Sequence, residues 1–299
     1  MIETAVNFLV ETQNPDGGWG VEKGRRSNTE ASAFALLGLG SQGERSLTTI
    51  IDRGLKWLTE QQHADGSWPL TDQFSQGSWA TALAALALAF FASHREQALR
   101  GADWLLRQEG KPLGRLQSVI YRIAPHKLPV QQNPDLKGWS WAPNTASWVE
   151  PTAYALMALK KLRPHLQSSR IEARIHEGEL LIYDRMCKGG GWNYGNSTVL
   201  GEDLLPYPDI TALTLIALQD HKAEANRVSL DALQKMLVQV QSGLALSWSI
   251  LCFALYSQET AEWKALLAKG YERTGFLGET KTLALALLAC TNKVSVFQV

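Results

Sequence analysis

The chain has 299 residues, of which 45% are hydrophobic and 19% charged, so it is long enough to bury a large core. Its 29 Lys and Arg residues balance 29 Asp and Glu residues, which argues against nucleic acid as a partner because phosphate binding requires a basic excess. Three widely spaced cysteines, Cys187, Cys252 and Cys290, form neither a disulfide framework nor a CxxC zinc site.

The N-terminal residues resemble no signal peptide, because they lack both a basic segment and a long apolar run. The longest apolar run, residues 80–92, is shorter than the roughly 20 residues that span a bilayer. We therefore expect a soluble, cytoplasmic globular protein.

The first predicted element is an amphipathic helix that ends in a turn rich in glycine. After this helix come Gln13, the segment Asn-Pro-Asp-Gly-Gly, and Trp19, and the same order recurs from Gln62 to Trp68. Glycine supplies the positive φ that such a turn requires, and the tryptophan is an apolar anchor for the turn. Degenerate copies of the turn are Gly189-Gly-Gly-Trp192 and Gly138-Trp139.

Each of six almost purely apolar segments begins with a variable residue followed two positions later by a hydroxyl residue. A helix that is apolar on every side must be buried on every side, so these segments predict inner helices. The six pairs are Glu30 and Ser32, Trp79 and Thr81, Glu150 and Thr152, Asp209 and Thr211, Ser247 and Ser249, and Thr280 and Thr282.

An amphipathic helix precedes each inner helix, which predicts an all-α, single (α/α)6 toroid of about twelve helices over residues 1–299. An open solenoid requires polar end repeats, but the last inner helix is as apolar as the others. We expect the outer helices at about 2–13, 48–62, 95–108, 171–186, 228–241 and 259–271.

One insert, residues 109–137, interrupts the repeat and contains four prolines. We expect this insert to be irregular, and the whole chain to contain no run of strands. A loop of this length inside a compact domain is usually functional. Its apolar residues make it a candidate lid or a peripheral contact with a membrane surface.

The Gln-x3-Gly-x-Trp pattern at Gln13–Trp19 and Gln62–Trp68 resembles the QW repeat of squalene-hopene and oxidosqualene cyclases. Class II terpene cyclases and prenyltransferase β subunits belong to the same superfamily and are similar in fold. The resemblance implies acid-initiated cyclisation or isomerisation of a hydrophobic polyprenyl or triterpenoid substrate. Squalene-hopene cyclases pair two toroids, whereas this chain resembles one.

In that family the acid is the middle aspartate of Asp-x-Asp-Asp, which is followed by Thr-Ala. Glu150, Asp209 and Glu30 occupy this frame here, without the flanking aspartates, and the resemblance makes them the candidate catalytic residues. Glu150 is the first choice because Trp148 and Thr152 lie beside it. A carboxyl in an apolar pocket has a raised pKa. Alternatively, acids in the first turn only complement the helix dipole.

Seven aromatic residues are expected at the same level as these acids. In the family, such rings stabilise a carbocation through their π faces, although aromatic residues at helical spacing also fill ordinary cores. The candidates for substrate binding are Phe34, Trp79, Trp141, Trp148, Tyr154, Tyr207 and Trp248.

No metal site and no cofactor are expected, because no cysteine has the partners of the prenyltransferase zinc site. If the substrate is a diphosphate, Glu202 and Asp203 are candidates to hold Mg²⁺, and Arg25 and Arg26 are candidates to contact the phosphates. A solvated loop and a surface pair are the simpler interpretations of these residues.

Two other functions are compatible with the sequence. The first is a non-catalytic toroid that binds an isoprenoid, a lipid or a protein partner, and the missing Asp-x-Asp-Asp motif favours it. The second is an enzyme acting on carbohydrate with paired carboxylates, which requires an open polar cleft rather than apolar inner helices.

Overall fold

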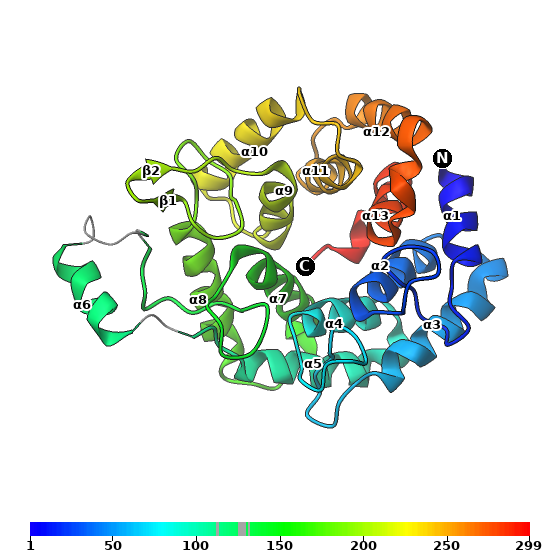
Figure 1. Ribbon diagram of the computed structural model, residues 1–299, viewed down its shortest axis with the longest axis horizontal. Helices are drawn as coiled ribbons and strands as arrows, with labels where there is room; N and C mark the ends of the chain where they lie inside the picture. Colours follow the sequence, from blue (N-terminus) through cyan, green and yellow to red (C-terminus); the bar gives the residue numbers. More distant parts are fainter. Residues whose placement is uncertain (112–113, 125–129, 131) are drawn as a thin grey trace.

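The computed structural model describes residues 1–111, 114–124, 130 and 132–299. Within these residues, helices form two concentric layers around a common centre (Figure 1). The inner helices are α2 (Thr29–Gly40), α4 (Ala80–Phe90), α7 (Val149–Leu162), α9 (Pro208–Ala217), α11 (Gly243–Leu255) and α13 (Thr280–Cys290). The outer helices are α1 (Ile2–Glu11), α3 (Thr48–Glu60), α5 (Arg95–Arg107), α8 (Ile171–Asp184), α10 (Glu224–Leu237) and α12 (Ala261–Thr274).

The inner layer is a closed ring, because each inner helix packs against the next and α13 packs against α2. Helix α1 covers α13, so the two ends of the repeat are joined in both layers (Figure 1). The prediction of an all-α (α/α)6 toroid is therefore confirmed. Among the described residues, no helix is both long and apolar enough to cross a membrane.

The tryptophan of each turn connects an outer helix to the following inner helix. The Trp19 and Trp68 side chains are fully buried, and each indole donates a hydrogen bond of 2.7 Å to the carbonyl oxygen ten residues earlier. Their backbone N–H groups donate to the hydroxyls of Ser32 and Thr81, both at 2.9 Å. Trp192 makes the same two bonds. The recurring hydroxyl residue thus accepts a bond that a buried N–H would otherwise lack.

The glutamine of the repeat joins successive outer helices. The Gln13 side-chain amide donates to the carbonyl oxygens of Gly17 and Ile50, both at 2.8 Å, and Gln62 donates in the same way to its own turn and to α5. Gly17 has a φ of 98°, and a Cβ there would lie 2.6 Å from the carbonyl oxygen of Arg53. Glycine is therefore required at this position by both backbone conformation and space.

The prediction of an irregular insert over 109–137 is wrong for part of this range. Residues Arg115–Ile123 form helix α6, which projects from the side of the ring (Figure 1). The segment contains no proline and places Val119 and Ile123 four residues apart, which is helical spacing. Residues 112–113, 125–129 and 131 lie outside the described residues.

The expectation of no run of strands holds for the described residues, which contain one short hairpin. Strands β1 (Thr198–Val199) and β2 (Glu202–Asp203) form a two-residue antiparallel hairpin, and Val130 forms a single bridge to Val199. Leu200 and Gly201, between the strands, both have positive φ, which is typical of a tight hairpin turn. Strands of two residues leave too little periodicity to predict.

Candidate functional site

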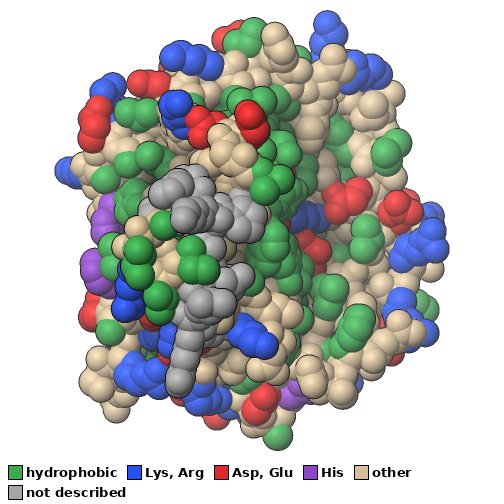
Figure 2. Space-filling view, turned by 60° about the vertical axis from the view of Figure 1, so that its left-hand side comes forward, with side chains coloured by type: hydrophobic (Ala, Val, Ile, Leu, Met, Phe, Trp, Pro, Cys, Tyr) green, Lys and Arg blue, Asp and Glu red, His purple; other side chains and the backbone are tan. Residues whose placement is uncertain are grey.

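A pocket of about 340 Å³ opens at the mouth of the toroid, where the N-terminal ends of inner helices converge. We call it the mouth pocket. Its lining is formed by Glu30, Trp79, Trp141, Glu150, Tyr194, Asp209, Ile210, Leu213, Leu244, Trp248 and Lys281. On the face drawn in Figure 2, hydrophobic side chains surround a hollow in which acidic and basic groups lie together.

The three acids predicted from the sequence all lie in this pocket. Glu30, Glu150 and Asp209 each occupy the first turn of an inner helix, in α2, α7 and α9. Because the repeats are arranged around a ring, equivalent helix starts face the same opening. The structure thus brings together three carboxyl groups, of which the first and the last are 179 positions apart in the sequence.

The sequence analysis missed Lys281, the basic residue of the pocket. Its Nζ lies 2.8 Å from Oε1 of Glu30 and 3.7 Å from Oε1 of Glu150, and its side chain is 14% exposed. It also lies over the Phe34 ring, 5.5 Å from the centroid. A buried ammonium group therefore faces the acids.

Lys281 was missed because the last inner helix was aligned one residue out of register. The alignment matched Thr282 to the other hydroxyl residues and so placed Thr280 at the variable position. In the structure Thr280 corresponds to Thr29, since the backbone N–H and hydroxyl of each bond to carbonyls of the next repeat around the ring. Lys281 therefore takes the place of Glu30.

Burial raises the pKa of Glu150 to about 7 from an ordinary value of 4.5. The Lys281 ammonium group opposes this shift, and the negative charges of Glu30 and Asp209 add to it. Glu150 is 8% exposed. A carboxyl with this pKa is partly protonated at neutral pH and is able to donate a proton.

Lys281 remains a cation at the same pH. Burial alone lowers its pKa, but the neighbouring Tyr154, Glu30 and Glu150 more than offset this effect and hold the pKa well above its ordinary value. Beneath them, burial raises the pKa of Tyr154. The Tyr154 hydroxyl is fully buried and makes no hydrogen bond to another described residue.

Three of the seven predicted aromatic residues form walls of the mouth pocket: Trp79, Trp141 and Trp248. Trp79 and Trp141 meet edge to face, with ring centroids 4.9 Å apart. Phe34 and Tyr154 are fully buried and pack on Trp248 at 6.0 and 6.3 Å. They therefore support the pocket from below rather than forming its wall.

The other two predicted aromatic residues, Trp148 and Tyr207, line a neighbouring hollow of about 460 Å³. Tyr194 borders both this hollow and the mouth pocket. On the other side, a hollow of about 180 Å³ that includes Leu70 and Phe74 shares Trp79 and Trp141 with the mouth pocket. The mouth pocket is thus the middle part of a longer depression.

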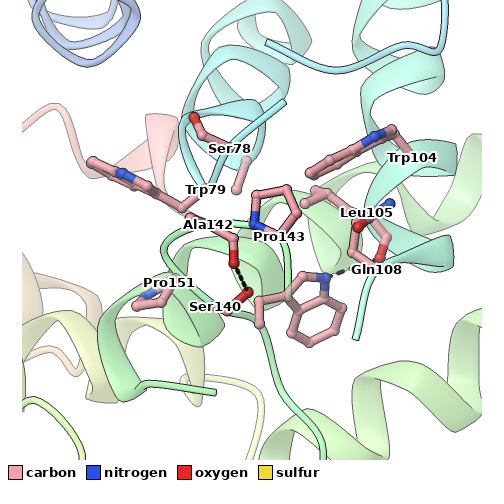
Figure 3. A pocket seen from close by; sticks show the side chains of 11 residues that line it. Ser78, Trp79, Trp104, Leu105, Gln108, Ser140, Ala142, Pro143 and Pro151 are labelled. Carbon is pink, nitrogen blue, oxygen red and sulfur yellow. Dashed lines mark hydrogen bonds between the residues drawn. The ribbon is translucent and has the colours of Figure 1, made fainter. Parts of the chain in front are cut away.

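A small cavity lies behind Trp79, between α4, α5 and the loop at residues 139–143 (Figure 3). Its volume of about 20 Å³ admits little more than one water molecule. In Figure 3, Pro143 lies between Trp79 and Trp104, and the Ser140 hydroxyl donates to the Ala142 carbonyl oxygen at 2.8 Å. This cavity backs the wall of the mouth pocket and is too small for an organic ligand.

The residues proposed to meet a diphosphate are paired elsewhere. Asp203 lies in the exposed hairpin, 3.0 Å from Lys188, and Arg26 lies 3.1 Å from Asp72. Arg25 lies 3.9 Å from Glu22. The described lining of the mouth pocket includes neither these residues nor Glu202.

Among the described residues, one group has the side chains of a metal site: Glu179, Asp220 and His221, whose ligand atoms lie within 4.8 Å of one another. A protein cation already occupies this group. Lys160 Nζ lies 2.7 Å from Glu179 Oε1 and 2.5 Å from Asp220 Oδ1. The group is therefore an ion-pair cluster, and a metal ion does not fit it without displacing Lys160.

A known family matches the part of the chain that contains the turns at Gln13–Trp19 and Gln62–Trp68. The family described as squalene-hopene cyclase C-terminal domain matches residues 1–78. The drimenyl diphosphate synthase of Streptomyces showdoensis is 36% identical over 66 residues, which are 22% of this chain and 12% of that protein. A squalene-hopene cyclase of Bradyrhizobium diazoefficiens is 33% identical over 134 residues, which are 44% of this chain and 18% of that protein.

Solved structures extend the likeness to nearly the whole chain. The type II terpene cyclase MstE from Scytonema, in complex with geranylgeranyl dihydroxybenzoate, has a TM-score of 0.60 at 16% identity and covers 99% of this chain and 97% of that one. The chain therefore has the same toroid fold as this class II terpene cyclase. An α-1,6-mannanase of Salegentibacter has a TM-score of 0.65 at 11% identity, covering 99% of this chain and 98% of its own.

Both structural likenesses are below 25% identity and show the fold alone, so they do not decide between isoprenoid and carbohydrate chemistry. The two curated relatives described above are a synthase and a cyclase, and the family match covers residues 1–78, which include Gln13 and Trp19. The matched segments cover less than a fifth of the length of each of the two curated relatives described above.

Proposed function

We propose that this cyclase-like toroid acts on a hydrophobic isoprenoid by acid-initiated cyclisation or isomerisation, with Glu150 as the general acid. The observation that carries the proposal is the buried Glu150 carboxyl, whose pKa is raised to about 7 inside a pocket walled by Trp79, Trp141 and Trp248. An acid that keeps its proton near neutral pH in an apolar, aromatic pocket is suited to protonate an alkene.

Lys281 and Glu30 determine which acid carries the proton. The Lys281 ammonium lies closer to Glu30 than to Glu150, at 2.8 against 3.7 Å. Lys281 therefore pairs mainly with Glu30, and Glu150, whose pKa is raised by burial, is the carboxyl that holds a proton.

In the proposed reaction the Glu150 proton forms a C–H bond with one alkene carbon as the π bond breaks, which leaves a cation on the other carbon. The indole faces of the pocket and the Glu30 and Asp209 carboxylates stabilise this cation. A second alkene then attacks it to close a ring and leaves a new cation. This cation, or the first one if no ring closes, loses a proton from a neighbouring carbon to the Glu150 carboxylate, and the electrons of that C–H bond form a new C=C bond. No cofactor is needed for either outcome.

The hollows on both sides of the mouth pocket support a long, flexible substrate. They share Trp79, Trp141 and Tyr194 with the pocket and carry exposed apolar side chains, including Phe74 and Leu205, at 59% and 79% exposure. An isoprenoid chain held with its reacting alkene at Glu150 has apolar surface available on either side.

Non-catalytic binding of an isoprenoid is the second candidate. It is favoured by the absence of the family's flanking aspartates around Glu150, Asp209 and Glu30. It predicts a complex without turnover, so the same experiment separates it from catalysis.

The test is to incubate the purified protein with squalene, farnesyl diphosphate and geranylgeranyl diphosphate and to search extracts for new products by mass spectrometry. We expect a product whose formation falls at least about 100-fold in Glu150→Gln, the loss typical of a general acid. The matched control is Glu96→Gln, which alters an exposed acid in the first turn of α5 and should leave turnover unchanged.

Full turnover by a Glu150→Gln, Asp209→Asn double variant would contradict the catalytic assignment. Unchanged substrate that copurifies with the protein would instead favour the binding role.

A further inference from the structure

The centre of the toroid is closed from the side opposite the mouth by residues 294–299, which follow α13. This segment enters the space inside the ring of inner helices, where Figure 1 marks the C-terminal residue. Val296 and Phe297 are completely buried, whereas Ser295 and Gln298 are exposed. The segment thus presents an apolar inner side to the core and a polar outer side to solvent.

Two side chains from the ends of inner helices hold the segment in place. Lys161, in the last turn of α7, donates from Nζ to the carbonyl oxygens of Ser295 and Gln298 at 3.0 and 2.9 Å. Gln219, just after α9, donates to the carbonyl oxygen of Phe297 at 2.9 Å and accepts from the backbone N–H of Val299 at 3.4 Å. These bonds to backbone groups fix the path of the segment across the opening.

Phe297 packs against the inner end of the mouth pocket. Its ring centroid lies 5.1 Å from that of Trp248. Trp248 lines the mouth pocket and is itself only 2% exposed. One indole therefore separates the pocket from Phe297. Leu213, at 1% exposure, and Ile210, at 3%, are the other buried apolar members of the lining.

We propose that Phe297 is a specificity-determining residue that sets the depth of the mouth pocket and so the length of apolar chain that it accepts. This inference rests on the proposed function for the identity of the substrate. The depth of the mouth pocket does not depend on that function. Trp248 is held in place by Phe297 on one side and by Phe34 and Tyr154 on others. Without the Phe297 ring, Trp248 is free to move inward, and an apolar chain is able to follow it.

Linear saturated alcohols provide a measure of pocket depth that does not depend on isoprenoid chemistry. Each additional methylene that becomes buried should tighten binding roughly fourfold, and the gain should stop at the length at which the pocket ends. We would measure dissociation constants by isothermal titration calorimetry for alcohols from hexanol to hexadecanol, with the unaltered protein and with Phe297→Ala.

We expect the affinity of the unaltered protein to reach a plateau as the alcohol lengthens. The affinity of Phe297→Ala should reach its plateau about two or more methylenes later, because the deeper pocket buries each added methylene. If Phe297→Ala does not fold, Phe297→Leu keeps most of the apolar contact and should show a smaller shift in the same direction. Lys161→Met removes both bonds to the segment and should also extend the plateau.

The matched control is Phe253→Ala, which removes another fully buried ring from α11, the helix that carries Trp248. It should leave the plateau length unchanged. An unchanged plateau in folded Phe297→Ala, or no dependence on length in either protein, would overturn the proposal. A shifted plateau without turnover of any isoprenoid would support the depth assignment and count against the catalytic proposal alone.

Discussion

The two ends of the toroid bury charge in different ways. At the mouth, Glu30, Glu150 and Asp209 face one ammonium group, that of Lys281. On the opposite side, Lys160 donates to Glu179, to Asp220 and to the carbonyl oxygen of Ala217, the last at 2.8 Å. Both groups contain more carboxyl groups than ammonium groups. Lys281, however, lies within hydrogen-bond distance of Glu30 alone and 3.7 Å from Glu150, whereas each proton of the Lys160 ammonium group has an acceptor.

This difference separates a structural from a chemical use of buried charge. A buried ion whose hydrogen-bonding capacity is fully used stabilises the fold only as long as all partners are present. A buried carboxyl that lacks a close cation has its pKa raised instead, mainly by burial, and Glu150 is the residue in which this shift appears. Departures from balanced polar burial are expected at functional sites.

The largest effect on stability is expected from removing the ammonium group of Lys160. Lys160→Met should lower the free energy of unfolding by about 3–5 kcal/mol, because it leaves Glu179 buried without its cation. Urea denaturation measures the change. The control is Lys56→Met, which removes an exposed 3.9 Å pair with Glu60 and should cost less than about 1 kcal/mol. Equal losses in the two variants would show that the group is not structural.

At the mouth, removing the charge of Glu150 should raise the free energy of unfolding rather than lower it. The folded pKa of Glu150 is raised from 4.5 to about 7, so its protonated form contributes stability that is complete below pH 4.5 and is lost as the pH rises through 7. Glu150→Gln should therefore be more stable than the natural chain at pH 8, by up to about 3 kcal/mol.

Thermal or urea unfolding from pH 4 to pH 8 measures this difference, and the two proteins should converge at the acid end. A Glu150→Gln variant that is less stable at pH 8 would show that the carboxylate is well compensated.

The same comparison explains what the sequence could predict. Gln13, Trp19 and Ser32 belong to a local, repeated pattern, and each makes a specific hydrogen bond that fixes one repeat to the next. The fold and the position of Glu150 follow from that repetition. Lys281 was assigned one residue out of register because the last inner helix lacks the preceding turn. Its only guide was Thr282, which bonds to Glu279 instead.

Phe297 and helix α6 were missed for different reasons. Phe297 belongs to no repeat, and its contact with Trp248 depends on the path of the chain after α13. No periodicity in the sequence encodes such a long-range contact. Helix α6 was missed because the prolines of the surrounding insert predicted an irregular segment, although the nine residues of α6 contain no proline and have helical spacing.

A smaller effect is expected when the cation of the mouth is removed. Lys281→Met should raise the pKa of Glu150 further, because Lys281 is the group that lowers it. The alkaline limit of turnover should move to higher pH. Lys281→Arg keeps the charge and should leave the limit nearly in place. A shift toward lower pH in Lys281→Met would contradict the assigned role of this ammonium group.

The smallest effect concerns the repeat itself. Gln13→Ala removes two side-chain hydrogen bonds of 2.8 Å and should cost about 1–3 kcal/mol of stability without altering the pH dependence. The control is Gln73→Ala, which alters an exposed side chain and should change stability by less than about 0.5 kcal/mol. If Gln13→Ala changed the pH dependence of stability, the repeat turns would affect the titration of the mouth pocket, which would contradict this prediction.

The most direct test of the account is a site-specific titration of Glu150. Carbon-13 labelling of the glutamate carboxyl groups, with the Glu150 resonance assigned by its loss in Glu150→Gln, gives the pKa by NMR. We predict a midpoint of about 7, which would establish a proton donor at the mouth near neutral pH. A midpoint near the ordinary value of 4.5 would show an ionised carboxylate there and would contradict Glu150 as the acid.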